Sequence, residues 1–283
     1  MKSSAALATV VFLTVPAVPA LADVPADVKA WLFAGDVNLR IPMSELNFPT
    51  GGAMPILTLG VSQVTLRYGG SALQGAVWTD SDWTSPQPML GPRPQPDSSQ
   101  TKGSMTGDFS LYSVSIALAP KGATQLVFLG YAGASYNFTM PSPVLCTIGP
   151  ACTPGTYYAT INNPLTSAFS YGDLQVGVRG EAERGAFTFS GALAVGAASA
   201  SGYVGWGSGA NRTSPTPVSG SGTVVSGELA AGYTFSEAGR VALGYQFVSF
   251  DVSGTAQFSP GGPTSWREWG SNQGATLTFV WSW

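Results

Sequence analysis

Segments in which apolar and polar residues alternate recur along most of this chain, and they limit the possible folds more than any other feature. The last ten residues, GATLTFVWSW, show the pattern most clearly, with Ala275, Leu277, Phe279, Trp281 and Trp283 at every second position. A period of two places these side chains on one face of a β-strand. The pattern predicts ten strands, at about residues 30–41, 54–62, 64–79, 107–119, 124–138, 169–181, 186–206, 222–236, 240–252 and 266–283.

Two kinds of all-β protein can contain such strands, a soluble sandwich and a transmembrane barrel. Charged residues make up only 10% of the chain, against about 25% in an average soluble domain. Mean hydropathy is positive, at +0.17. Beyond the first two dozen residues no apolar run reaches about 18 residues, the length that a transmembrane helix needs. The composition therefore favours a barrel whose outer surface faces lipid.

The connections between the predicted strands alternate between short turns and long loops. Short turns are expected near SQ at 62–63 and in APKGA, AERG and SEAGR; long loops are expected at about 42–53, 80–106, 139–168, 207–222 and 253–265. Bacterial outer-membrane barrels are built in this way, with short periplasmic turns and longer extracellular loops. Every proline after residue 22 lies outside or at the edge of a predicted strand, as a closed ladder requires. We therefore predict an all-β, antiparallel transmembrane barrel of about ten strands.

Aromatic and polar residues indicate how such a barrel would be arranged. Tryptophans are expected in two belts at the membrane interfaces, one formed by Trp31, Trp281 and Trp283 and the other by Trp78, Trp83, Trp206, Trp266 and Trp269. Polar strand positions are expected to pair across a narrow lumen, which stiffens a small barrel. These positions are Asp36, Asn38, Arg40, Gln175, Arg179, Glu181 and Glu228.

The first 22 residues have the features of a signal peptide. Lys2 precedes an apolar stretch at 5–15, and the small residues ALA at 20–22 precede Asp23. We therefore expect export, localisation in the bacterial outer membrane, and one barrel domain over residues 23–283. In an oxidising compartment, Cys146 and Cys152 are expected to form a disulfide that closes a short loop, with two free thiols as the alternative.

The segment VWTDSDWTS sets Asp80 and Asp82 between two tryptophans at the end of a predicted strand. Farther along come GDFSLYSVSIAL and QLVFLGYAGASYNF, in which Gly130-Tyr131 is followed by Tyr136-Asn137-Phe138. This order resembles the omptins, ten-stranded outer-membrane proteases that carry Asp-x-Asp-Trp at the same strand end and a Gly-Tyr…Tyr-x-Phe strand two strands later. The sequence resemblance is confined to about residues 75–85 and 125–140.

The omptin resemblance implies a catalytic dyad at Asp80 and Asp82, opposite an Asp-x-His dyad whose histidine takes a proton from the attacking water. The matching positions here are Gly205 and Gly207, and the chain has no histidine. A general base needs proton affinity matched to neutral pH, which aspartates alone supply poorly. We therefore expect a barrel of omptin type without protease activity, whose role is structural, adhesive or binding and depends on its extracellular loops.

Other functions and partners follow from the same residues. One alternative is an omptin-like aspartic endopeptidase or other hydrolase that uses Asp80 and Asp82 with a different base, such as Asp251 or Glu268; another is a small diffusion pore. Asp80 and Asp82 could also bind a cation or form a hydrated rim.

The expected partners are outer-membrane lipid, the barrel-assembly machinery, an unidentified extracellular ligand and, by resemblance to omptins, lipopolysaccharide. The assembly machinery reads a C-terminal signal like the alternation that ends on Trp283. We expect no cofactor and no bound metal. We also expect no nucleic-acid partner, because the 12 basic residues are scattered and form no basic patch.

Overall fold

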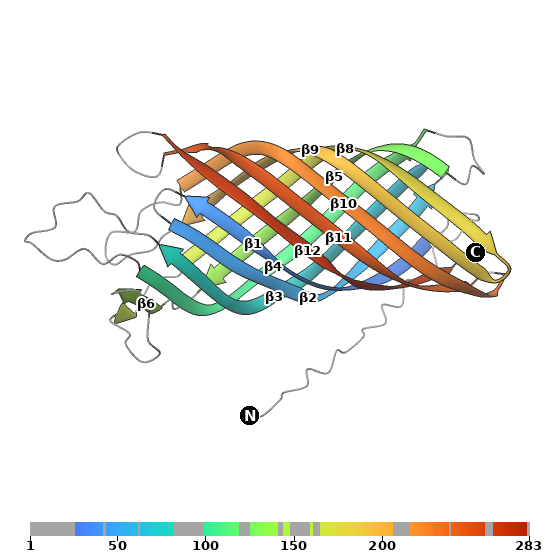
Figure 1. Ribbon diagram of the computed structural model, residues 1–283, viewed down its shortest axis with the longest axis horizontal. Helices are drawn as coiled ribbons and strands as arrows, with labels where there is room; N and C mark the ends of the chain where they lie inside the picture. Colours follow the sequence, from blue (N-terminus) through green and yellow to red (C-terminus); the bar gives the residue numbers. More distant parts are fainter. Residues whose placement is uncertain are drawn as a thin grey trace, which may run out of the picture.

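The computed structural model describes residues 26–41, 44–61, 63–81, 99–118, 125–140, 144–147, 159–160, 165–205, 216–237, 239–257 and 263–281. Ten long antiparallel strands in these ranges form one closed barrel, because β1 pairs with β12 as well as with β2. The predicted ten-stranded antiparallel barrel is confirmed (Figure 1). The long strands are β1 (Ala26–Ile41), β2 (Ser44–Val61), β3 (Val64–Ser81), β4 (Ser99–Ala117), β5 (Gln125–Met140), β8 (Leu165–Arg184), β9 (Phe187–Gly205), β10 (Thr216–Ser236), β11 (Gly239–Ala256) and β12 (Thr264–Trp281).

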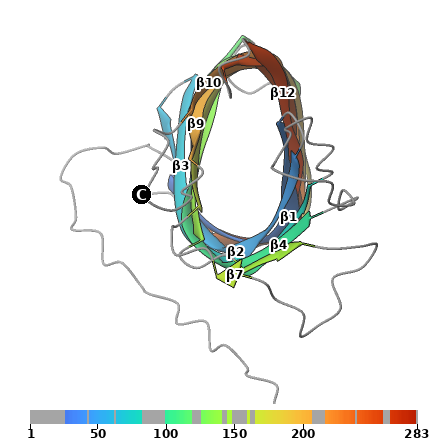
Figure 2. The same ribbon diagram turned by 90° about the vertical axis from the view of Figure 1, so that its left-hand side faces the viewer.

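Two short strands extend the sheet beside one end of the barrel. β6 (Val144–Thr147) pairs with the start of β4, and β7 (Ala159–Thr160) pairs with β6. The barrel strands run obliquely to its long axis, and an end view shows an elliptical cross-section (Figures 1 and 2). The flattened shape brings side chains from opposite walls close to each other.

The two ends of the barrel differ in their connections, as the sequence predicts. Short connections join β2 to β3, β8 to β9 and β10 to β11, whereas the connections from β3 to β4, from β5 to β8 and from β9 to β10 are longer. The prediction of a long loop at 42–53 is wrong, because β1 and β2 stay paired up to Ile41 and Ser44. Pro49 lies opposite Asp36 on β1, and the described β2–β3 pairs leave out residues 48–55, where the missing N–H donor of a proline costs little. We call the half of the barrel nearer the short turns the turn half, and the other the loop half.

The outer face of the turn half carries a continuous belt of exposed apolar side chains. On β12 the predicted alternation is confirmed, since Leu277, Phe279 and Trp281 all face outward. The belt also includes Leu57, Leu59, Leu66, Val114, Ile116, Val127, Leu129, Leu174, Val176, Val178, Leu193, Val195, Leu229 and Leu243. A lipid-facing band of this kind is typical of outer-membrane barrels. No helix in the described ranges is both long enough and apolar enough to cross a membrane.

The outer face of the loop half is small and polar instead. On β10 the outward positions change from Leu229 to Ser221 and Ser219, and on β11 they change from Leu243 to Ser249 and Asp251. Because this part of the wall is hydrophilic, it stands clear of the lipid hydrocarbon. The barrel is therefore longer than its membrane-spanning part.

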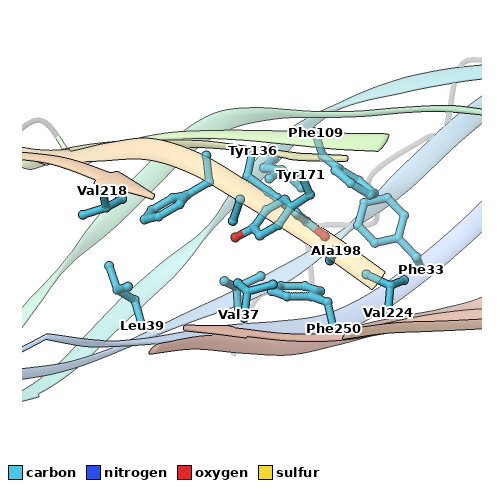
Figure 3. Close-up of a cluster of buried hydrophobic side chains, with 14 of the residues drawn as sticks. Phe33, Val37, Leu39, Phe109, Tyr136, Tyr171, Ala198, Val218, Val224 and Phe250 are labelled. Atoms are coloured by element: carbon cyan, nitrogen blue, oxygen red, sulfur yellow. The ribbon is translucent and has the colours of Figure 1, made fainter. Parts of the chain in front are cut away.

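The interior of the barrel has the reverse distribution. In the loop half, inward side chains form one apolar cluster, which includes Val37, Leu39, Phe109, Val218 and Phe250 (Figure 3). In the turn half, the inward side chains include Lys29, Thr58, Gln246, Thr276 and Thr278, all buried. The loop half is therefore organised like a soluble protein, and the turn half like a membrane protein.

This reversal corrects several predictions about which face a residue occupies. Trp31 and Trp266 were assigned to interface belts, but both point inward, with 0% and 2% of their surface exposed. Asp36, Asn38 and Arg40 were assigned to the lumen, but they alternate with the buried Val37 and Leu39 and therefore face outward. Those predictions assumed that apolar faces always meet lipid, which fails where the wall is surrounded by water. Trp281 and Trp269 face outward, as the predicted interface belts require. The side chains of Trp78, Trp83, Trp206 and Trp283 lie outside the described residues.

Candidate functional site

The structure describes only part of the predicted acidic dyad. Asp80 lies near the end of β3, and the backbone ladder places it opposite Glu45 on β2 and Gln100 on β4. Asp82 lies outside the described residues, so the pairing of the two carboxylates stays a prediction. Gly205 ends β9, opposite Thr166, and Gly207 lies outside the described part.

Of the two cysteines, only Cys146 lies in the described residues. Cys146 lies on β6, and its backbone is opposite Gln100 of β4, the residue that also faces Asp80 across the ladder. Cys152 falls outside the described ranges, and the disulfide therefore stays a prediction. Asp80 and Cys146 thus lie on strands that flank the same segment of β4.

The two carboxylates considered as substitute bases lie on opposite faces of the barrel wall. Asp251 faces outward and accepts two hydrogen bonds from Arg267, at 2.8 Å from Nε and 2.5 Å from the terminal nitrogen. Glu268 points inward, is 1% exposed, and accepts a hydrogen bond from the hydroxyl of Tyr171. They therefore cannot serve one reaction space together.

Side chains in the loop half connect opposite walls of the barrel across its interior. The ring of Phe250 on β11 lies 5.0 Å from Tyr171 on β8 and 6.0 Å from Tyr136 on β5, measured between ring centres (Figure 3). Phe169 on β8 lies 6.0 Å from Trp266 on β12. These aromatic contacts fill the space that a channel would need.

Hydrogen bonds reinforce this aromatic core. The side-chain amide of Asn272 on β12 donates to the hydroxyl of Tyr136 on β5 at 2.8 Å, and its oxygen accepts a hydrogen bond from Thr50 on β2. Three strands from different parts of the wall are thereby joined at buried residues. The loop half of the lumen is closed by packing and by hydrogen bonds together.

A polar network occupies the interior of the turn half, as predicted for Gln175, Arg179, Glu181 and Glu228. Lys29 donates a hydrogen bond to Glu228, and a terminal nitrogen of Arg67 lies 3.6 Å from the same carboxylate. Arg240 forms an ion pair with Glu181. Lys29 and Arg67 were not among the predicted lumen residues, although each occupies a strand position of the same parity as inward residues such as Trp31 and Leu73.

The outer face of the loop half carries one aromatic and charged cluster. The guanidinium groups of Arg40 and Arg267 lie 5.3 and 5.1 Å from the ring centre of Trp269, within range for cation–π attraction. Asp251 fixes Arg267 on one side. In the described part of the chain, no group of three or more Cys, Asp or Glu side chains could hold a metal ion.

Comparison with known proteins places this architecture in a recognised class. No protein family model matches the sequence, and no curated protein sequence matches it either. The outer membrane protease OmpT from Escherichia coli has a similar structure, with a TM-score of 0.62 at 11% sequence identity, covering 92% of this chain and 96% of that one. The toluene transporter TodX of Pseudomonas putida (TM-score 0.31, 7% identity, 92% and 89% covered) and the translocator domain of the autotransporter NalP from Neisseria meningitidis (0.38, 6%, 92% and 88%) are more distant. The chain therefore has the fold of a bacterial outer-membrane barrel, and its likeness to OmpT is a likeness of fold.

Proposed function

We propose that this protein is a closed outer-membrane barrel without protease activity, which serves as a platform for binding or adhesion through its long extracellular loops. The observation that carries this proposal is the filled interior of the loop half. Phe250, Tyr136 and Tyr171 meet across the lumen, and Asn272 is bonded to both Tyr136 and Thr50. A barrel closed in this way offers its outer rim, and not its lumen, to extracellular ligands.

Two features of the sequence support the absence of protease activity. The chain has no histidine, and Gly205 and Gly207 stand where the omptin resemblance requires the second dyad. Positioned acid–base groups typically contribute about 10²–10⁴-fold to rate. Asp80 and Asp82 are then part of a hydrated rim or a cation site.

The partners in this proposal are the lipids around the apolar belt, the barrel-assembly machinery, an unidentified loop ligand and lipopolysaccharide. Arg40 and Arg267 flank Trp269 on the outer face above the belt. At that level their guanidinium groups would meet the anionic groups of lipopolysaccharide, which arginine binds well.

Ion conductance through a planar lipid bilayer tests the closed barrel. We expect no steady conductance from the refolded parent, because the rings in the loop half leave no continuous path for water. A Phe250→Ala, Tyr136→Ala, Phe169→Ala triple variant should conduct, whereas Leu243→Ala on the outer belt should stay closed. Steady channels from the parent would contradict the platform and favour the diffusion pore.

A further inference from the structure

Two neighbouring cavities lie inside the barrel, on the side of the aromatic core that faces the turn half. The first, the polar chamber, has a volume of about 80 Å³, and its walls include Thr65, Arg67, Arg179 and Glu228. The second, the aromatic chamber, has a volume of about 120 Å³, and its walls include Phe109, Tyr136, Tyr171 and Phe250. Arg67, Gln175 and Gln246 line both chambers, so the two adjoin.

The polar chamber contains two arginines whose donors are largely unused. Arg67 approaches Glu228 only to 3.6 Å and makes no hydrogen bond with any described residue, while Glu228 already accepts a hydrogen bond from Lys29. Arg179 packs its guanidinium 5.6 Å from the ring centre of Phe128 and likewise makes no hydrogen bond within the described ranges. Each guanidinium carries five N–H donors in a planar fork that matches a carboxylate.

The aromatic chamber has a different character. Four rings and the side chains of Leu111, Ala134 and Val248 make its walls mostly apolar. Asp173 also lines it, and its carboxylate accepts a hydrogen bond from Gln175 at 2.5 Å. That negative charge opposes an anion in this chamber, whereas Glu228 in the polar chamber is paired with Lys29. An anionic group would therefore lie at the arginine end and an apolar group next to the rings.

The lumen opens toward the turn end of the barrel on the side of β3 and β8. There the exposure of inward side chains rises from 2% at Tyr136 to 26% at Arg67 and 44% at Glu181, whereas Lys29 on β1 and Thr278 on β12 stay buried. In outer-membrane barrels the short turns face the periplasm. The two chambers thus form a blind cavity that is closed by the aromatic core and accessible from the periplasmic side.

We propose that this blind cavity binds a small carboxylate with an aromatic or other compact apolar body. The carboxylate lies between Arg67 and Arg179, and the body lies beneath Phe109, Tyr136 and Phe250. A cavity of about 150 Å³ suffices for benzene in a protein core, so the aromatic chamber takes a body no larger than one ring. This site goes beyond the platform role of the loops and does not depend on it.

Calorimetric titration of the refolded barrel in a zwitterionic detergent tests the site, with benzoate, neutral benzamide and cationic benzylammonium as probes. We expect benzoate to bind, and benzamide and benzylammonium to bind at least about tenfold more weakly, since charged hydrogen bonds carry the affinity. Arg67→Gln and Arg179→Gln should each weaken benzoate binding by about tenfold or more. Arg267→Gln, the matched charge change on the outer face, should leave it unchanged.

A second variant separates the two chambers without touching a charge. Ala134→Leu fills part of the aromatic chamber and should weaken benzoate while leaving acetate binding at the arginines unchanged. The altered gel migration of the unboiled barrel verifies that each variant is folded. Absence of benzoate binding, or equal binding by the parent and both arginine variants, would overturn the proposal. So would benzylammonium binding as tightly as benzoate, because Asp173 would then be the anchor.

Discussion

Glu268 lies among aromatic side chains in the loop-half core, where the hydroxyl of Tyr171 donates a hydrogen bond to it. A charge inside an apolar core is costly unless it is paired, and no Lys or Arg of the described residues forms an ion pair with Glu268. The side chain therefore contributes through its hydrogen bond and its volume more than through its charge.

Substitutions at Glu268 separate these contributions. Glu268→Gln keeps an oxygen acceptor for Tyr171 and removes the charge, so we expect it to be at least as stable as the parent. Glu268→Ala leaves a void and an unpaired hydroxyl, and should lower the free energy of unfolding by about 2–4 kcal/mol. Urea unfolding in detergent micelles, followed by tryptophan fluorescence, measures both. A glutamine variant as unstable as the alanine variant would show that the charge itself stabilises the core.

At Asp80 and Asp82 the expected result is an absence of catalysis. Refolded protein in detergent containing lipopolysaccharide should cleave dibasic peptides no faster than the Asp80→Asn, Asp82→Asn double variant does. The reason is that the chain has no histidine to accept the proton of an attacking water. Cleavage by the parent but not by the double variant would show that the pair is catalytic and that another residue is the base.

Among the strands, β1 shows how one element serves two environments. Its inward face carries Trp31, Phe33, Val37 and Leu39, while Leu32, 59% exposed, faces outward in the belt. Trp31 contacts Phe33 and Phe109, with ring centres 5.0 and 6.4 Å away. The adjacent residues Trp31 and Leu32 thus lie in different surroundings, Trp31 in the packed interior and Leu32 on the lipid-facing surface.

This difference predicts unequal costs for two truncations on β1. Trp31→Ala should lower the free energy of unfolding by about 3–5 kcal/mol, because it opens a cavity in the packed interior. Leu32→Ala should cost less than half as much, since detergent or lipid fills the space that the side chain leaves. Urea titration of both variants in the same micelles gives the comparison. Equal losses would mean that Trp31 is not part of the packed core.

The strands could be predicted from the sequence, but the faces of some strands could not. Alternation located all ten long strands and the belt positions on β8, β10 and β12, because the belt needs apolar residues at every second position. On β1 the same alternation was assigned to the wrong face, since period two is identical whether the apolar face meets lipid or the interior. The charge pairs within the lumen join residues far apart in the chain, by 199 positions for Lys29 and Glu228 and by 59 for Arg240 and Glu181, and no local pattern indicates them.

For the whole molecule, the division into two halves predicts a sharp change in accessibility along a single strand. Ser221 and Leu229 both face outward on β10, one in each half. In reconstituted vesicles, on a background with Cys146 and Cys152 replaced by serine, Ser221→Cys should react with a membrane-impermeant maleimide. Leu229→Cys should stay unlabelled until detergent is added. Labelling of both positions in intact vesicles would contradict the assignment of the belt to the membrane.

The length of the strands sets how far the barrel reaches from the membrane. β10 has 21 residues, and at roughly 3.3 Å per residue with a tilt of about 40° it rises roughly 50 Å along the barrel axis. The apolar band of an outer-membrane barrel is only about 25 Å tall. The strand ends from which the loops start are thus raised above the lipid by roughly the thickness of the hydrocarbon layer itself. If the loops bind as we propose, a ligand on another cell or on a surface polymer would be met at that height, and not at the plane of the membrane.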